Sequence, residues 1–235
     1  MSDLNKSRIG RVLGLVTVAA LLAIPPTLLA WLALPRFSAG LAMLGAPPIV
    51  SQRLAGAAIT PSMSMEAEHA FSRALASDGE SELWRAELLA VRASRDVLAL
   101  KEARTLALDG LSKYPASPRG WTVLCEIEIG IERSKAAECM DTAFYVGPFD
   151  WFVVKRRTLL AAYLWPQLDR DTQEAAARQL KRIWEDQRLR AIAYDASREP
   201  NGAGLVSAAF HGDTSTMSAF ERGLASVPAQ RKVTP

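Results

Sequence analysis

Residues 103–148 read ARTLALDGLSKYPASPRGWTVLCEIEIGIERSKAAECMDTAFYVGP and carry the clearest structural signal in the chain. Small or apolar residues recur there at spacings of three and four, and a proline follows each series. The two series, 33 residues apart, are Ala103, Ala107, Gly110 and Pro115, then Ala136, Met140, Ala143 and Pro148. Because residues three or four apart share one helix face, and proline stops a helix, the stretch predicts a helix that occurs twice.

Helical spacing continues on both sides of this stretch, and no segment alternates as a strand would. Upstream, Ala67, Phe71 and Ala74 share a face, and Trp84 begins the next helix. Downstream, the predicted helices cover residues 149–168, residues 171–193 with a capping box at the start, and one or two short helices within 203–224. Apolar residues at this period favour an all-α domain.

Trp121 and Leu124 open the helix between the two copies. A Trp and a Leu at the start of a first helix, small residues at its contact with a second helix, and a proline after the second resemble the tetratricopeptide (TPR) family. The resemblance is best over residues 81–148. It implies antiparallel helical hairpins stacked as an α-solenoid, in which Trp121 fills the volume between hairpins.

Two features depart from the family pattern. Cys125 stands where Gly or Ala is usual, and the loop after Gly130 is one residue short. The alternative is an amphipathic bundle without repeats, but three features that recur together at one period favour the repeat.

The N-terminal part predicts a membrane anchor. From Val12 to Pro35 the chain reads VLGLVTVAALLAIPPTLLAWLALP without a charged residue, and about 20 apolar residues suffice to cross a bilayer. Lys6, Arg8 and Arg11 precede it, so the N-tail is expected in the cytoplasm and the domain outside. A cleaved signal peptide is the alternative. The expected organisation is 1–11 cytoplasmic N-tail, 12–35 transmembrane helix, 36–63 linker, 64–225 TPR-like domain and 226–235 flexible tail.

The net charge of +3 belongs to the membrane flank. Four of the 28 basic residues and one of the 25 acidic residues lie within residues 1–36, which leaves 24 of each for the rest. A protein that neutralises nucleic-acid phosphates needs a basic surplus, so nucleic acid is not expected as a partner.

No residue pattern predicts catalysis, a cofactor or a metal. His69 and His211 are the only histidines, and neither has metal-ligand spacing to Cys, Asp or Glu. Glu126 and Glu128 are two apart and face different sides of a helix, so they are not a catalytic pair. Phosphate-loop and nucleophile-elbow motifs are missing from the sequence.

The two cysteines, Cys125 and Cys139, fall on the two helices of one predicted hairpin. In an exported domain such a pair can form a disulfide. The alternative is two buried thiols that act as small apolar side chains.

The first helices of stacked hairpins usually form a concave binding face. The residues predicted on that face are Arg85, Arg92, Arg119, Thr122, Glu126 and Ile129, joined by Lys155 or Arg156. Their basic bias suits a carboxylate-bearing extended segment or an anionic glycan. As surface charges, Arg85, Arg92 and Arg119 are expected to tolerate charge reversal without loss of the fold. Ordinary solvated charges are the alternative.

The expected function is that of an anchored protein-interaction scaffold at the outer face of a bacterial inner membrane. The layout of the chain resembles that of small anchored proteins that accompany bacterial exopolysaccharide synthesis and export. The segments that carry this resemblance are Gly147-Pro148 and the helix from Trp165 to Leu168. The resemblance implies a role in envelope or exopolysaccharide assembly. A periplasmic assembly chaperone for exported subunits or apoproteins is the alternative. A glycan-modifying enzyme is less favoured because no convergent polar set appears.

Overall fold

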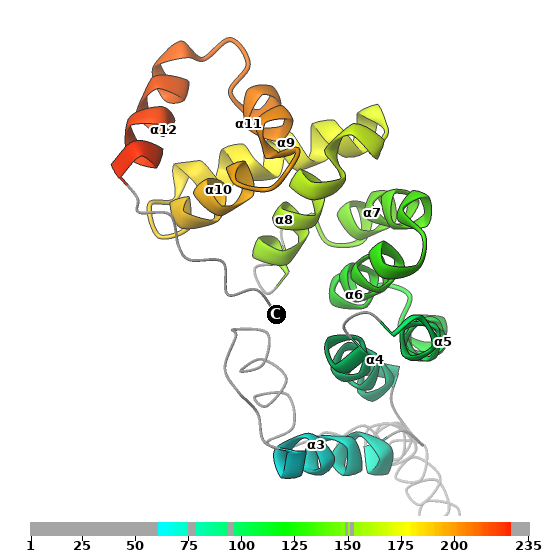
Figure 1. Ribbon diagram of the computed structural model, residues 1–235. Helices are drawn as coiled ribbons and strands as arrows, with labels where there is room; N and C mark the ends of the chain where they lie inside the picture. Colours follow the sequence, from blue (N-terminus) through cyan, green and yellow to red (C-terminus); the bar gives the residue numbers. More distant parts are fainter. Residues whose placement is uncertain (1–60, 75–78, 94–95, 149, 151–152, 227–235) are drawn as a thin grey trace, which may run out of the picture.

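The computed structural model describes residues 61–74, 79–93, 96–148, 150 and 153–226, and within them every regular element is helical. The helices run in chain order through a curved body (Figure 1). They are α3 (Pro61–Ala74), α4 (Gly79–Ala93), α5 (Val97–Lys113), α6 (Pro118–Ile131), α7 (Arg133–Val146), α8 (Val154–Leu164), the 3-10 turn η1 (Trp165–Gln167), α9 (Arg170–Glu185), α10 (Arg190–Ser197), α11 (Gly202–Ala209) and α12 (Thr214–Ser226).

Consecutive helices pair as hairpins. α4 packs along α5, and α6 packs along α7 with only Glu132 between them. The first helices also touch one another, α4 against α6 and α6 against α8, while α7 contacts α9. Figure 1 shows α4, α6 and α8 following one another on one side, with α5 and α7 on the other. One face of the molecule is therefore built from α4, α6 and α8.

Small side chains form the contacts inside and between the hairpins, as the 33-residue spacing predicts. Ala103, Ala107, Ala136 and Ala143 are fully buried. Trp121 differs from the prediction because it is only partly buried. Its indole Nε1 donates to the carbonyl of Pro115 at 2.8 Å, in the loop before α6, and the side chain packs against the core.

An enlarged side chain at Ala136 tests this close packing. Ala136→Leu should lower the free energy of unfolding by about 1–3 kcal/mol, because a filled helix contact must open to accept the added atoms. The matched control is Ala203→Leu on the exposed side of α11. Chemical denaturation that gives equal midpoints for both variants would show that α6 and α7 do not pack as described.

Several helix ends differ from the sequence prediction. The N-cap of α9 is Asp169, whose carboxylate accepts from the backbone N–H of Thr172 at 2.8 Å, rather than Asp171. α9 also ends at Glu185, and the residues up to Ala193 belong to a turn and to α10. α3 begins at Pro61, inside the segment assigned to the linker.

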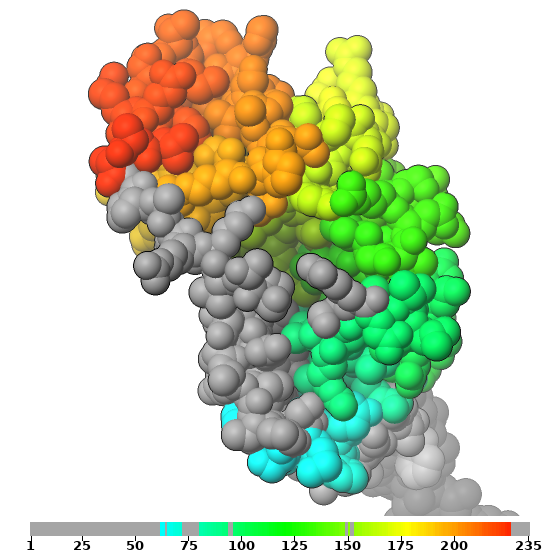
Figure 2. Space-filling model, viewed as in Figure 1, coloured from blue at the N-terminus to red at the C-terminus, as the bar shows by residue number. Residues whose placement is uncertain are grey.

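Aromatic side chains unite the last helices. Trp184 of α9 lies 7% exposed among the rings of Tyr194, Phe210 and Phe220, with centroid distances of 5.8, 5.8 and 5.4 Å. These rings come from α10, the end of α11 and α12, so one residue joins four helices. Figure 2 shows this C-terminal part, in orange and red, at one end of the body and α3, in cyan, at the other.

Arg157 of α8 is fully buried and ties three helices together. Its Nη1 donates to the carbonyl oxygens of Ala143 at 2.8 Å and Gly147 at 2.5 Å, the end of α7. Its Nε donates to Oε1 of Gln179 on α9 at 3.0 Å. Burial lowers the pKa of Arg157 to about 10, and the attraction of Asp150 offsets only part of that effect.

Asp213 caps α12 and gives a pH-dependent contribution. Its carboxylate accepts from the backbone N–H of Thr216 at 2.9 Å and from the hydroxyl of Ser215 at 2.8 Å. The bond from Thr216 is the main reason that the pKa of Asp213 falls to about 2. Since the unfolded value is about 3.9, this contribution is complete above about pH 4 and is lost as the pH falls through about 2.

The variant Asp213→Asn removes the titration and tests it. The difference in unfolding free energy between parent and variant should shrink as the pH falls from about 5 to about 2. Urea unfolding at several pH values measures it. A constant difference over that range would mean that the carboxylate is not held by the start of α12.

The N-tail, the predicted transmembrane helix at 12–35, residues 36–60 of the linker and the tail from 227 lie outside the described residues. Among the helices that the structure describes, none combines the length and the apolar character needed to cross a bilayer.

Candidate functional site

Glu87 forms the centre of an ion-pair network on the face built from α4, α6 and α8. This side chain is 1% exposed and accepts from two guanidinium groups. Arg119 of α6 binds it through Nε at 3.1 Å and through Nη2, and Arg156 of α8 binds it through Nη1. Arg156 also reaches Glu126, with 2.8 Å between Nε and Oε1. The network therefore links all three helices.

The pKa values of the two arginines reflect this setting. Burial lowers the pKa of Arg119, and Glu87 opposes the shift without cancelling it. Burial alone would also lower the pKa of Arg156, but attraction and hydrogen bonds from Glu126 and Glu87 outweigh it and raise the value. Both guanidinium groups stay charged at neutral pH, and they are already paired with the carboxylates of Glu87 and Glu126.

Two hollows lie on either side of the bond between Glu126 and Arg156. The hollow between α4 and α6 has a volume of about 240 Å³, and that between α6 and α8 about 310 Å³. Ile129, Glu126 and Arg156 line both. The remaining lining residues are Glu87, Ala90, Val91, Leu100, Val123 and Gly130 in the first, and Leu159, Leu160, Tyr163 and Glu199 in the second.

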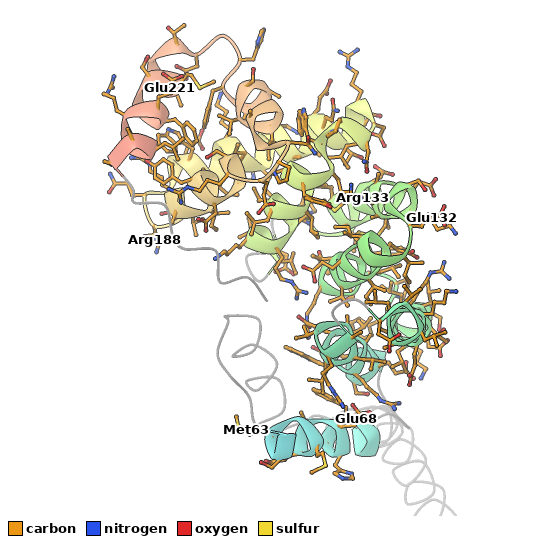
Figure 3. The ribbon with its side chains drawn as sticks, in the orientation of Figure 1. Met63, Glu68, Glu132, Arg133, Arg188 and Glu221 are labelled. Carbon is orange, nitrogen blue, oxygen red and sulfur yellow. A yellow bond between two sulfur atoms is a disulfide. The ribbon has the colours of Figure 1, made fainter. Side chains whose placement is uncertain are left out.

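Gly130 and Tyr163 shape the two hollows. A Cβ at position 130 would lie 2.6 Å from Cδ1 of Leu100, so glycine lets α6 pack closely against this residue of α5, which lines the first hollow. In the second, the hydroxyl of Tyr163 accepts from Arg133, whose guanidinium lies 5.0 Å from the ring centroid. Figure 3 places Arg133 and its neighbour Glu132 where α6 turns into α7.

The structure brings together only some of the residues predicted for this face. Glu126 and Ile129 line both hollows. Arg85 instead pairs with Glu68, with Nε 2.5 Å from Oε1, and Figure 3 shows Glu68 on α3. Arg92 is exposed at the end of α4 but lines neither hollow. Thr122 is fully buried and donates to the carbonyl of Pro118 at 2.8 Å.

The expectation that charge reversal at Arg119 would leave the fold intact is wrong. Its side chain is 17% exposed, bound to Glu87 and stacked on the Trp84 ring. An acidic side chain there would face a buried carboxylate, so charge reversal at Arg119 should disturb the fold. Between the two alternatives for α8, Arg156 enters the network while Lys155 is exposed and lies 3.7 Å from Asp195.

The sequence prediction missed Glu87, Leu159, Tyr163 and Glu199. Glu87 and Tyr163 occupy helix positions that the spacing assigns to the same faces as Trp84 and Arg156, so helical periodicity could have included both. Glu199 lies in the turn between α10 and α11, and no helical period predicts its place.

The two cysteines form a disulfide in the structure, with Cα atoms 5.5 Å apart and both side chains buried. Cutting it should lower the free energy of unfolding by about 3 kcal/mol, the chain-entropy value for a closed loop of about 15 residues. The measurement is denaturation of the parent with and without reductant. The double variant Cys125→Ala/Cys139→Ala is the control and should not respond to reductant. An equal response in both would rule out a stabilising disulfide.

A larger hollow of about 590 Å³ lies on the other side, between α7 and α9. Phe144, Ala175 and Gln179 line it together with charged residues of both signs, and Tyr145 at its edge is 86% exposed. The residues described here hold no cluster of His, Cys, Asp and Glu that would suit a metal ion.

Comparison of the chain with known protein families, with curated proteins and with solved structures finds no match.

Proposed function

We propose that this protein is a membrane-anchored interaction scaffold that holds a partner on the face of α4, α6 and α8. In this proposal the hairpins α4–α5, α6–α7 and α8–α9 are three units of a TPR-like solenoid. The helices α10 to α12 cover its end, as terminal units of such repeats must.

The observation that carries the proposal is the pair of hollows across the three first helices. They lie side by side, share Ile129, and are separated by a fixed bond between Glu126 and Arg156. Apolar walls with a few fixed polar groups are typical of binding sites. Because Glu87 locks the three helices together, the face is already in place before a partner arrives, which lowers the entropic cost of binding.

An anchor at residues 12–35 and a domain outside the cytoplasm complete the proposal. The uncharged length of that segment and the basic residues before it support an inner-membrane anchor with the domain in the periplasm. The disulfide suits an oxidising compartment of that kind. The mature protein should begin before residue 12. A C-terminal reporter that works only in the periplasm should be active, and one that works only in the cytoplasm should be inactive.

Envelope or exopolysaccharide assembly is the context that we propose for the scaffold. A periplasmic chaperone that binds extended segments transiently is the second candidate, favoured by the apolar lining and the internally paired charges of the hollows. The two functions differ in how long the contact lasts.

Crosslinking followed by purification of the full chain from membranes tests the proposal. A scaffold should yield one partner in fixed proportion, and Ile129→Arg or Leu159→Arg should lose it. A changing set of partners would favour the chaperone. The control is Tyr145→Ala on the opposite side, which should keep the partner. Retention by both arginine variants would show that the partner binds elsewhere.

A further inference from the structure

From the geometry of the two hollows we infer that the partner segment is extended, carries two apolar side chains three residues apart, and has a basic residue beside the second. This inference rests on the proposed function and specifies the ligand of the same face. It differs from the acidic ligand that the arginine-rich sequence favours.

The charges of the face argue against an acidic segment. The arginines at its centre are already bound, Arg119 to Glu87 and Arg156 to Glu87 and Glu126. An acidic ligand would have to displace Glu87, which is 1% exposed, or Glu126, which is 30% exposed and held by Arg156, or lie beside these carboxylates and be repelled by them. The remaining surface of both hollows is mainly aliphatic, so uncharged apolar side chains fit them without breaking the network.

The spacing of the hollows sets the spacing of the two anchors. One hollow lies between α4 and α6 and the other between α6 and α8, so they are offset by about one helix–helix distance, about 8–10 Å. A polyproline-II segment rises about 3.1 Å per residue and returns to the same side every three residues, so side chains three apart are about 9 Å apart. Side chains two apart in a strand are only about 7 Å apart and match less well.

Glu199 defines the third feature. It lines the second hollow, is partly exposed, and forms no ion pair with any residue that the structure describes. Glu126, which lines the same hollow, is already held by Arg156. A lysine or arginine next to the second apolar anchor would meet this free carboxylate. Such a partly exposed pair adds up to about fivefold in affinity and fixes the direction of the segment.

Three synthetic peptides and the full chain in detergent test the inference by fluorescence polarisation. The first peptide has two leucines separated by two prolines and followed by lysine. The second replaces both leucines with serine, and the third replaces lysine with glutamate. The first should bind at least about tenfold more tightly than the second. It should bind up to about fivefold more tightly than the third, and this second difference should fall with salt.

Variants of the face complete the test. Ile129→Arg should weaken the first peptide at least about tenfold, since Ile129 borders both hollows. Glu199→Lys should reverse the preference between lysine and glutamate peptides, and it should keep the parental melting curve because the Glu199 side chain forms no ion pair within the described part of the chain. The control Glu174→Lys lies on the exposed side of α9 and should change neither preference.

Three results would overturn the inference: tighter binding of the glutamate peptide to the parent, equal binding of the serine peptide, or no measurable binding of any peptide. If a membrane partner that depends on Ile129 and Leu159 is still recovered in any of these cases, the proposed function stands and only the ligand class is wrong. If that partner is also absent, both fail.

Discussion

Trp184→Ala is expected to lower the free energy of unfolding by about 3–5 kcal/mol, the range for removal of a large buried aromatic side chain. The ring is 7% exposed and contacts three other aromatic rings from three elements. The guanidinium of Arg190 lies 4.6 Å from its centroid and its Nε donates to the Trp184 carbonyl at 2.9 Å. Loss of the ring leaves a cavity where α9, α10, α11 and α12 meet.

The control for this variant is Tyr145→Ala. Tyr145 is 86% exposed, so its removal should change the free energy of unfolding by less than about 0.5 kcal/mol. Urea denaturation followed by circular dichroism measures both variants. A loss below about 1 kcal/mol for Trp184→Ala would mean that the last three helices do not form a common core with α9.

Glu87→Ala is expected to cost about 3–5 kcal/mol for a different reason, because removal of one partner leaves buried charge uncompensated. Arg119 would lose its carboxylate altogether, and Arg156 would keep only Glu126. Since the Arg119 side chain is 17% exposed and the Arg156 side chain 21% exposed, water can replace only part of the lost interaction.

A second substitution separates lost charge pairing from lost packing. If uncompensated charge is the cause, Glu87→Met/Arg119→Met should recover much of the stability lost in Glu87→Ala, because well-packed apolar residues can replace a buried ion pair. Glu174→Ala is the control, since Glu174 is exposed and pairs within its own helix. Equal effects of Glu87→Ala and Glu174→Ala would show that the network does not hold α4, α6 and α8 together.

The all-helical fold was predictable because its signal is local. Small residues at helical spacing mark places where two backbones must approach closely, and Ala103 and Ala136 are fully buried as this reasoning requires. Helix ends were less predictable because nearby carboxylates compete as caps. Asp169 and Asp171 both suit the N-cap position, and the backbone N–H of Thr172 donates to the carboxylate of Asp169, which makes Asp169 the cap.

The candidate binding face was only partly predictable because helical spacing gives the direction of a side chain but not its partner. Glu87 lies 32 residues from Arg119 and 69 from Arg156, and these pairs depend on the relative heights of three helices. For the same reason, the prediction from sequence treated Arg85 and Arg119 as unpaired positive charges, although they form ion pairs with Glu68 and Glu87. Acid and base counts along one helix cannot reveal such pairing.

The most direct measurement of partner binding is site-specific photocrosslinking in intact cells. A photoreactive amino acid at position 159, in the second hollow, should yield a discrete crosslinked product with one partner. The same group at position 145, on the opposite side, should yield none. A product from position 145 with none from position 159 would contradict partner binding on the face of α4, α6 and α8.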